Sequence, residues 1–524
     1  MISYPLVSLI RDQKDKTRAR DMEHVDVLVV GAGISGIGAG YHLQTLCPGR
    51  SYAIFEGRDR LGGTWDLFRY PGIRSDSDMY TLGFSFRPWK EAKAIADGPS
   101  ILNYVRETAE AYGIDRHIRH QHKVKRAAWN SADSTWTVEF ERGPDAIPDR
   151  ITCNFLYMCA GYYNYAQGYR PDFPGEDQFQ GRIVHPQAWP EDLDHAGKQV
   201  VVIGSGATAV TLVPAMADKA AHVTMLQRSP TYVVSRPGED ALAIQLRKFL
   251  PAKLAYDIIR WRNVLLQMYF FNTARKHPEG VKTRLLDMVR QELGADYDVA
   301  THFTPKYNPW DQRLCLVPDS DLFAAIRTGS ASVVTDHVDT FTADGIRLKS
   351  GLTLPADIIV TATGLEMQLM SGLDVSVDGE PIDLTQTFSY KGMMYSGVPN
   401  LASAFGYTNA SWTLKADLTA EYVCRLLNHM DRHGQSECRP LNDDPNLEAA
   451  PWLDFSSGYI TRGMKKFPKQ GTRAPWRVYQ NYALDLMAFR YGKLEDGVMR
   501  FSGGAGSKRA RPSTRRTVAE PAGA

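Results

Sequence analysis

Two glycine-rich turns are the residues of this 524-residue chain whose spacing most directly indicates chemistry. The first reads Gly31-Ala32-Gly33-Ile34-Ser35-Gly36, and the second reads Gly204-Ser205-Gly206-Ala207-Thr208-Ala209. Glycines at this spacing let the backbone bend sharply and approach a pyrophosphate, which then lies at the N-terminus of the following helix. One such turn is weak evidence, but two of them, with a distinctive linker between, predict two dinucleotide-binding sites.

The residue that ends the second strand of each unit predicts which dinucleotide binds there. Glu56 ends the run Tyr52–Phe55, and its carboxylate can accept from a ribose 2′-hydroxyl while repelling a 2′-phosphate. Arg228, followed by Ser229, takes the same place in the second unit, where a guanidinium can grip a 2′-phosphate with two hydrogen bonds. The first site therefore suits FAD or NAD and the second suits NADPH. The alternatives are a turn without ligand and, for Arg228, an ordinary surface charge.

Two further segments are rich in residues that are typical of functional sites. The loop from Gly62 to Asp76 contains Gly63, Thr64 and Trp65, and its Trp, Arg and Asp content favours a site over a spacer. A tight surface turn is the alternative. The linker Phe179–Pro190 fits the pattern F-x-G-x-x-x-H-x-x-x-W-P and lies just before the second glycine turn. Its four fixed positions other than the proline are Phe179, Gly181, His185 and Trp189.

Apolar runs predict the strands that must position these turns. Val25–Val30 leads into the first turn and Val200–Ile203 into the second, and both are almost continuously apolar, as parallel strands covered on both faces should be. We therefore expect an α/β fold with two Rossmann-like dinucleotide-binding domains, for FAD and NADPH, and a helical insertion in the second.

The expected boundaries follow from these runs and from changes in composition. The chain divides into a leader at 1–22, a discontinuous FAD-binding domain at 23–170 and 362–502, an NADPH-binding domain at 171–237 and 306–361, a helical insertion at 238–305, and a basic tail at 503–524. We expect the leader and the tail to be disordered.

Helical spacing within the insertion places several apolar side chains on one face. They are Leu254, Ile258, Trp261, Leu265 and Met268. A stripe that faces the core is the favoured interpretation. The alternative is a basic amphipathic face that rests on a membrane or lines a substrate mouth. Its cations would be Arg260, Arg262, Arg275 and Lys276.

Composition describes an ordinary globular protein, with 43% hydrophobic and 23% charged residues. A formal charge of +2 gives no overall attraction to nucleic acid, so no nucleic-acid partner is expected. The six cysteines form no C-x-x-C pair and no metal-ligand spacing, so we expect no metal site and a reducing, cytoplasmic location. No apolar run approaches the ~18 residues of a membrane span. Peripheral membrane contact and an oligomeric state stay open.

Taken together, the loop and the linker resemble the two fingerprints of Baeyer–Villiger monooxygenases, which are class B flavoprotein monooxygenases. The two glycine turns resemble the FAD and NADPH signatures of that class, and the resemblance spans roughly residues 23–500. It implies FAD, NADPH, O2 and a ketone or sulfide substrate. Oxygen would be inserted next to the ketone carbonyl through a C4a-peroxyflavin to give an ester or lactone, and sulfides or thioamides would be S-oxygenated.

The resemblance also implies roles for single residues. Arg313 would be the active-site arginine and Asp76 its carboxylate partner. Tyr80 and the backbone at Val124 would contribute to FAD binding, and His185 would act in the linker during domain motion. Relatives often carry a lysine before the arginine; Gln312 stands here, so Arg228 would carry more of the NADPH preference.

Three other functions remain open at this point. One is a flavin monooxygenase acting mainly on sulfur or amine nitrogen. A second is a disulfide-reductase type of enzyme, against which the missing C-x-x-C pair argues. The third is a flavin-binding redox sensor without turnover, against which Arg313 and Asp76 argue.

Overall fold

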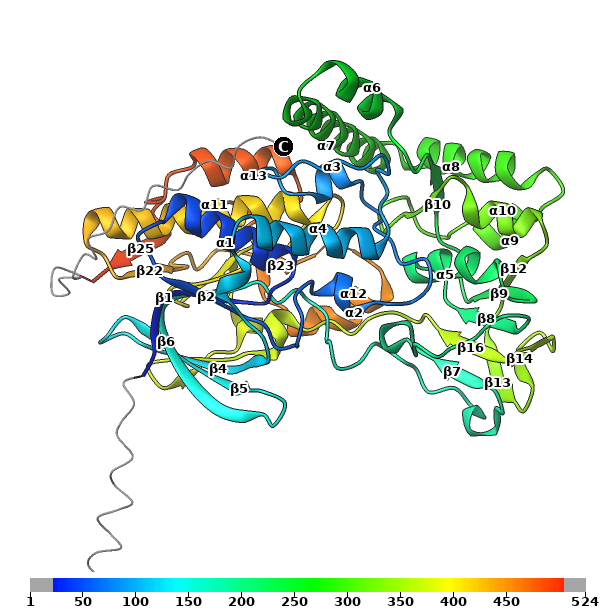
Figure 1. The fold of residues 1–524 in the computed structure, drawn as a ribbon, viewed down its shortest axis with the longest axis horizontal. Helices are drawn as coiled ribbons and strands as arrows, with labels where there is room; N and C mark the ends of the chain where they lie inside the picture. The colour runs from blue at the N-terminus through cyan, green and yellow to red at the C-terminus, as the bar shows by residue number, and fades with distance from the viewer. Residues whose placement is uncertain (1–21, 454, 504–524) are drawn as a thin grey trace, which may run out of the picture.

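The computed structural model describes residues 22–453 and 455–503, and two sheets organise them (Figure 1). The expected leader and basic tail lie outside the described residues except at Met22 and Gly503. The α/β fold class is confirmed. The division into domains stays a prediction, although each glycine turn belongs to a different sheet.

The first sheet has nine strands, and its parallel part carries the first glycine turn. The order is β18-β17-β4-β5-β6-β1-β2-β3, with β21 pairing with β6. The parallel strands are β1 (His24–Val30), β2 (Tyr52–Phe55), β3 (Ile118–Arg119), β6 (Ile147–Met158) and β21 (Leu401–Ser403). Val27, Leu28 and Val29 are completely buried, which explains why the sequence of β1 is continuously apolar rather than alternating.

Helices cover one face of this sheet, and a mixed set of strands, antiparallel except for the parallel pairing of two of them, extends its edge. The helices include α1 (Ile34–Leu46), α4 (Gly98–Ala111) and α11 (Trp412–His433). The extension consists of β4 (His122–Asn130), β5 (Thr135–Arg142), β17 (Asp374–Val377) and β18 (Glu380–Pro381).

The second sheet is smaller and wholly parallel. Its order is β12-β9-β8-β16-β7. The strands are β7 (Arg182–Val184), β8 (Gln199–Ile203), β9 (His222–Gln227), β12 (Ala331–Thr335) and β16 (Ile358–Thr361). Helix α5 (Ala207–Ala217) starts directly after the second glycine turn, and α10 (Asp321–Arg327) packs beside it.

The helices of the insertion follow the top and right of Figure 1; the first two project at the top, and the last packs against β12 of the second sheet. They are α6 (Ala241–Phe249), α7 (Ala252–Lys276), α8 (Pro278–Leu293) and α9 (Val299–Phe303). Helix α7 contacts the short helix α3 (Met79–Leu82) of the first unit. No helix within the described part of the chain is long and apolar enough to cross a membrane.

The core-facing stripe expected on α7 is wrong. Leu254, Trp261 and Leu265 are 48%, 46% and 58% exposed, whereas the side of α7 that faces the core carries Tyr256 and Ile259. The helix has apolar residues on both sides, and α3 covers only one of them. The alternative, a basic face on α7, is not continuous either, because one of its four cations is buried.

Arg260, expected on that basic face, is buried instead. It donates from Nη1 to the carbonyl oxygens of Tyr80 and Gly83, at 2.8 Å each, and lies 3.8 Å from Asp417. A guanidinium supplies five donors, which lets it satisfy several backbone carbonyls at the end of α3.

Candidate active site

The first glycine turn has the geometry of a phosphate-binding loop. Gly31 has a φ of +105°, and a Cβ there would lie 2.6 Å from the carbonyl oxygen of Cys159. A Cβ at Gly36 would lie 1.8 Å from the carbonyl oxygen of Gly31, so only glycine lets the first turn of α1 pack against the loop. The turn therefore presents bare backbone, as a pyrophosphate requires.

Glu56 lies beneath this turn at the end of β2. Its carboxylate accepts hydrogen bonds from the backbone N–H groups of Ala32 and Arg58, at 2.9 Å each. Burial raises the pKa of Glu56, and the two backbone donors oppose that rise. The carboxylate thus holds the loop in shape and borders the place where a ribose would lie.

A cavity of about 470 Å³ joins the first turn to residues from distant parts of the chain. The sequence-predicted residues among those that line it are Gly31, Gly33, Ile34, Ser35, Glu56, Gly63, Thr64, Trp65, Asp76, Val124 and Arg313. Glycine backbone, a buried carboxylate and a cation therefore border one space. That donor set fits an FAD with its diphosphate at the turn and its ribose at Glu56.

Two of the residues predicted to bind FAD are not among those that line the cavity. Gly36 lies behind the loop, where it permits the close packing described above. Tyr80 is buried in α3, and its hydroxyl accepts a hydrogen bond from Arg247 of α6. The side chain of Tyr80 therefore contacts the insertion rather than the cavity.

Arg313 and Asp76 form a two-point ion pair at the cavity wall. Arg313 Nε lies 3.1 Å from Asp76 Oδ2, and Arg313 Nη2 lies 3.3 Å from Oδ1. The carboxylate of Asp76 raises the pKa of Arg313, against the opposing effect of burial. Because 37% of the Arg313 side chain remains exposed, the cation still faces the open space.

Several aromatic residues around this pair were missed from the sequence. The hydroxyls of Tyr162 and Tyr163 are 2.7 Å apart, and the Tyr162 ring stacks on Trp412. Trp412 Nε1 donates to Ser35 Oγ at 2.7 Å, which ties α11 to the first turn. Tyr162 directly follows Cys159, Ala160 and Gly161, and Trp412 is the first residue of α11, but no local pattern marks either as part of a site.

A small apolar space adjoins the cavity beyond Arg313. It shares Tyr162, Arg313, Tyr407 and Trp412 with the main cavity and is otherwise mostly aromatic and aliphatic. The further lining residues include Met367, Phe405, Leu453, Phe455, Tyr459 and Ile460. Its open volume is only about 10 Å³, so these side chains largely fill it in this structure.

The second glycine turn is open to solvent. Gly204 has a φ of +144°, and a Cβ there would lie 2.3 Å from the carbonyl oxygen of Ala362, whereas a Cβ at Gly206 would meet nothing. Ser205 Oγ donates to the carbonyl oxygen of Ser229 at 3.0 Å, so the end of β9 lies beside the turn. Ala207 and Thr208 then start α5.

Arg228, directly after β9 and beside the second glycine turn, is an unpaired cation among the described residues. It is exposed at the end of β9 and forms no hydrogen bond or ion pair with any residue in the described part of the chain. Its guanidinium is thus available to an anion bound at the second turn.

The linker residues lie between the two units, outside the cavity. Phe179 is buried in the second unit, and a Cβ at Gly181 would lie 2.3 Å from the carbonyl oxygen of Asp357. His185 accepts from the backbone N–H of Gln187, and burial lowers its pKa. Trp189 packs partly buried against the second core.

The loop from Gly62 to Asp76 reaches from the first unit into the second. Phe68 and Tyr70 are buried in the core of the second unit. Arg69 pairs with Glu191 at 2.8 Å, and Arg74 pairs with Asp321 at 2.5 Å. With Arg313 and Asp76, three ion pairs connect this loop to the second unit, so the loop both lines the cavity and joins the domains.

Comparison with known proteins agrees with this arrangement. Residues 25–264 match the model of the flavin-binding monooxygenase-like family. The chain is 56% identical over 481 residues to the FAD-containing monooxygenase EthA of Mycobacterium tuberculosis, which covers 92% of this chain and 98% of that protein. The chain belongs to the flavin-binding monooxygenase-like family. This flavin-binding monooxygenase is also 50% identical over 483 residues to the probable FAD-binding monooxygenase AlmA of Acinetobacter baylyi, with 91% and 96% coverage.

Solved structures share the fold of this flavin-binding monooxygenase. A steroid monooxygenase bound to NADP superposes with a TM-score of 0.74 at 22% identity, covering 92% of this chain and all of the other. An open structure of cyclohexanone monooxygenase gives 0.72 at 21% identity with the same coverage. The fold that the resemblance implied is thereby confirmed.

Proposed function

We propose that this flavin-binding monooxygenase inserts one oxygen atom of O2 next to the carbonyl of a ketone, giving an ester or lactone. FAD would occupy the cavity and NADPH the second turn. Reduced FAD supplies the electrons and the activated oxygen when it is bound. The observation that carries the proposal is the Arg313–Asp76 pair, a fixed cation beside the glycine-lined cavity.

Arg313 would stabilise negative charge that develops on oxygen during the reaction. A guanidinium does not release its proton at working pH, so it remains a cation whatever base forms beside it. Asp76 binds it from one side through Nε and Nη2 and leaves Nη1 without that partner. A prearranged donor of this kind stabilises a transition state without having to reorganise.

The apolar side chains beyond Arg313 would move apart to hold the substrate, because the space between them is only about 10 Å³ in this structure. Its aromatic lining favours an apolar ketone or sulfide and excludes water from the reacting atoms. The steroid and cyclohexanone monooxygenases with which the fold superposes are named for ketone or apolar substrates, which supports the ketone as the principal substrate. Sulfides and thioamides would be S-oxygenated at the same place.

A competition experiment tests this choice of substrate. The purified enzyme receives NADPH, O2, a cyclic ketone and an aryl methyl sulfide together, and the products are quantified. We expect lactone as a principal product along with some sulfoxide. Sulfoxide alone would point to the alternative of an enzyme that mainly oxygenates sulfur. NADPH oxidation at the same slow rate with and without substrates would instead indicate a redox sensor.

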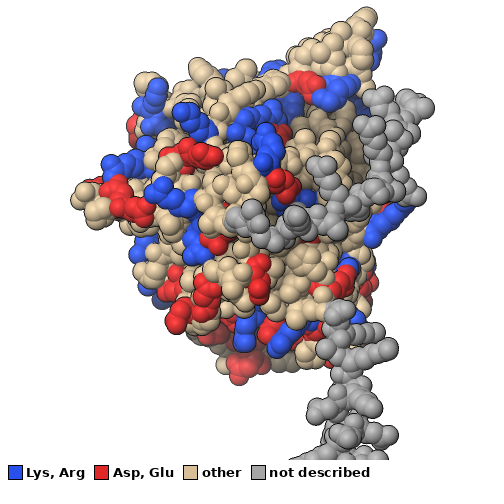
Figure 2. Space-filling view, turned by 90° about the vertical axis from the view of Figure 1, so that its left-hand side faces the viewer, with Lys and Arg blue, Asp and Glu red and all other residues tan. Residues whose placement is uncertain are grey.

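We further propose that the exposed face of α6 and α7 rests on an anionic membrane surface. This tip projects at the top of Figure 1 and is largely uncharged in Figure 2. Its exposed apolar side chains are Leu242, Phe249, Leu254, Ile258, Trp261, Leu265, Leu266 and Tyr269. Lys248 flanks them as an exposed cation, and Lys253 does so paired with Asp257 at 2.5 Å. Aromatic and aliphatic side chains with lysines at the border are typical of interfacial helices.

A further inference from the structure

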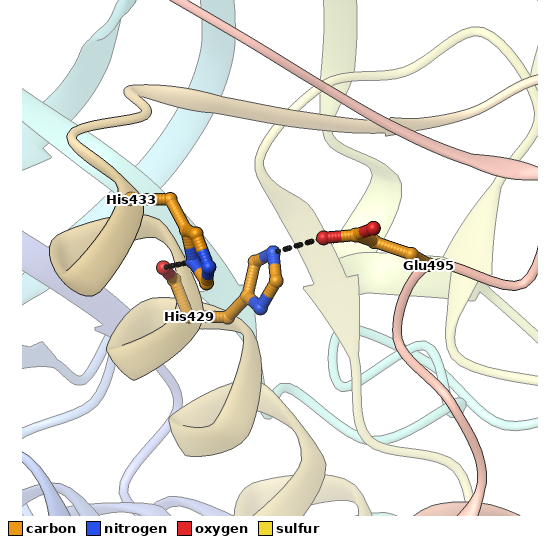
Figure 3. Close-up of side chains that lie close together, drawn as sticks. All are labelled: His429, His433 and Glu495. Atoms are coloured by element: carbon orange, nitrogen blue, oxygen red, sulfur yellow. Dashed lines mark hydrogen bonds and ion pairs between the residues drawn. The ribbon is translucent and has the colours of Figure 1, made fainter.

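Two histidines and a glutamate meet at the end of α11 that lies away from the cavity (Figure 3). His429 and His433 are one turn apart on the helix, and Glu495 comes from the segment before β25 (Met499–Ser502). One possible ligand atom from each lies within 4.8 Å of the others. Within residues 22–453 and 455–503 this is the one group of three or more such side chains that can hold a metal ion.

His429 is buried and directed into this cluster. The residue is only 8% exposed, and its Nε2 lies 3.3 Å from Glu495 Oε1 without a hydrogen-bond partner. The ring is held between the rings of His433 and Phe501, at centroid distances of 4.2 and 4.5 Å.

His433 is oriented for the same purpose by a backbone contact. Its Nδ1 lies 2.8 Å from the carbonyl oxygen of His429, an acceptor, so Nδ1 carries the proton and donates it. This contact fixes the tautomer and leaves the lone pair on Nε2 for a ligand. Histidines that bind metals commonly have their second nitrogen held in this way.

Glu495 stands on an anchored turn, although its side chain is exposed. The next residue, Asp496, accepts hydrogen bonds from the backbone N–H groups of Val498 and Met499, at 3.1 and 2.9 Å. Asp496 also accepts from the Tyr390 hydroxyl at 2.7 Å. The carboxylate of Glu495 is therefore presented from a fixed backbone.

We infer that His429, His433 and Glu495 bind a divalent zinc ion. Two imidazole nitrogens and one carboxylate oxygen are a donor set that Zn²⁺ accepts, with water in the fourth position of a tetrahedron. The ion would join the last turn of α11 to the segment before β25. Arg432, a nearby cation, opposes the ion, so we expect micromolar rather than tighter binding.

Calorimetric titration of the untagged, chelator-treated holoenzyme with zinc chloride tests the site. We expect one saturable site. His433→Ala and Glu495→Gln alter exposed side chains, should preserve the fold, and should each weaken zinc binding roughly tenfold or more. His277→Ala removes another exposed imidazole, on the insertion, and should change nothing. The flavin absorbance spectrum confirms that each variant is folded.

Proteolysis gives a second measurement. Lys493 is exposed two residues before Glu495, so zinc should slow tryptic cleavage there in the unaltered chain but not in Glu495→Gln. The inference is overturned if the wild-type protein shows no saturable zinc binding. It is also overturned if His433→Ala binds zinc as tightly as the wild type does.

Discussion

Arg313 is the residue on which the proposed oxygen insertion depends most. Arg313→Ala should keep FAD and still be reduced by NADPH, because the glycine turns are untouched. It should lose oxygen insertion by roughly a hundredfold to a thousandfold, the usual effect of removing one donor to a developing oxyanion. Lysine should restore part of the activity, since a point charge replaces the charge but not the planar two-point contact with Asp76.

The measurement for Arg313 is the amount of ester formed and hydrogen peroxide released for each NADPH consumed. The alanine variant is expected to divert NADPH oxidation to hydrogen peroxide. Ester yield and rate close to those of the wild type would show that another cation supports the reaction.

Arg228 should determine the preference for NADPH over NADH. Its guanidinium is exposed and unpaired among the described residues, so Arg228→Ala should disturb little else. Losing a charge-assisted contact to the 2′-phosphate should lower kcat/KM for NADPH by about tenfold to a hundredfold, equivalent to about 1.5–3 kcal/mol. The value for NADH should hardly change. An unaltered ratio of the two kcat/KM values would contradict the assignment.

At the level of residues, the sequence predicted features that form within one short segment better than contacts between segments that are distant in the chain. The glycines and Glu56 were predictable because each acts within one strand–turn–helix unit. The place of Tyr80 was not, because its contact with Arg247 depends on how a distant insertion packs. Tyr162 and Trp412 meet from positions 250 residues apart in the chain, and no local pattern specifies that stacking.

At the level of elements, helix α7 also shows that the sequence predicts a local pattern but not the packing of that pattern against other elements. Helical spacing correctly identified a continuous apolar row, but periodicity cannot say whether another element covers it. The buried row contains Ala255, Tyr256 and Ile259, while the predicted row faces outward apart from the partly buried Met268. The strands were easier to predict, because burial of both faces leaves a continuous apolar run.

The exposed row on α7 predicts binding to membranes. The enzyme should sediment with vesicles that contain phosphatidylglycerol and much less with vesicles of phosphatidylcholine alone. A double variant, Phe249→Glu with Leu265→Glu, should bind at least about tenfold less, since each apolar side chain contributes up to ~1.5–3 kcal/mol when buried. Leu352→Glu is the matched control, because Leu352 is 51% exposed on the second unit.

Two outcomes of the sedimentation experiment would contradict the proposal. One is that neither kind of vesicle binds the wild-type enzyme. The other is that size-exclusion chromatography shows an oligomer that the double variant dissociates, in which case a second copy of the chain covers the face.

At the level of the whole molecule, ion pairs that cross between the two units should govern how efficiently NADPH is used. Asp321→Asn removes the charge that pairs with the largely buried Arg74 and keeps the side-chain volume. A partly buried ion pair stabilises the observed arrangement of the two units by about 1 kcal/mol. We therefore expect the variant to release several-fold more hydrogen peroxide for each NADPH consumed. FAD content should stay the same.

Asp192→Asn provides the control for this prediction. Asp192 pairs with Arg182 within the second unit and is 78% exposed, so its loss should leave the coupling unchanged. Equal hydrogen peroxide yields from Asp321→Asn and the wild type would show that the Arg74 pair does not hold the units in their working position.

The two partners of the Arg313–Asp76 ion pair come from different units of the molecule. Asp76 belongs to the first unit, and Arg313 reaches the cavity from a segment that returns to the second. The electrostatic potential inside the cavity is therefore a function of the angle between the two units. A rotation that separates the pair by a few ångströms would leave a cavity bordered by an uncompensated carboxylate, and a rotation back would restore the compensated ion pair. The same chain can thus present two electrostatic environments to one bound molecule without any change in protonation.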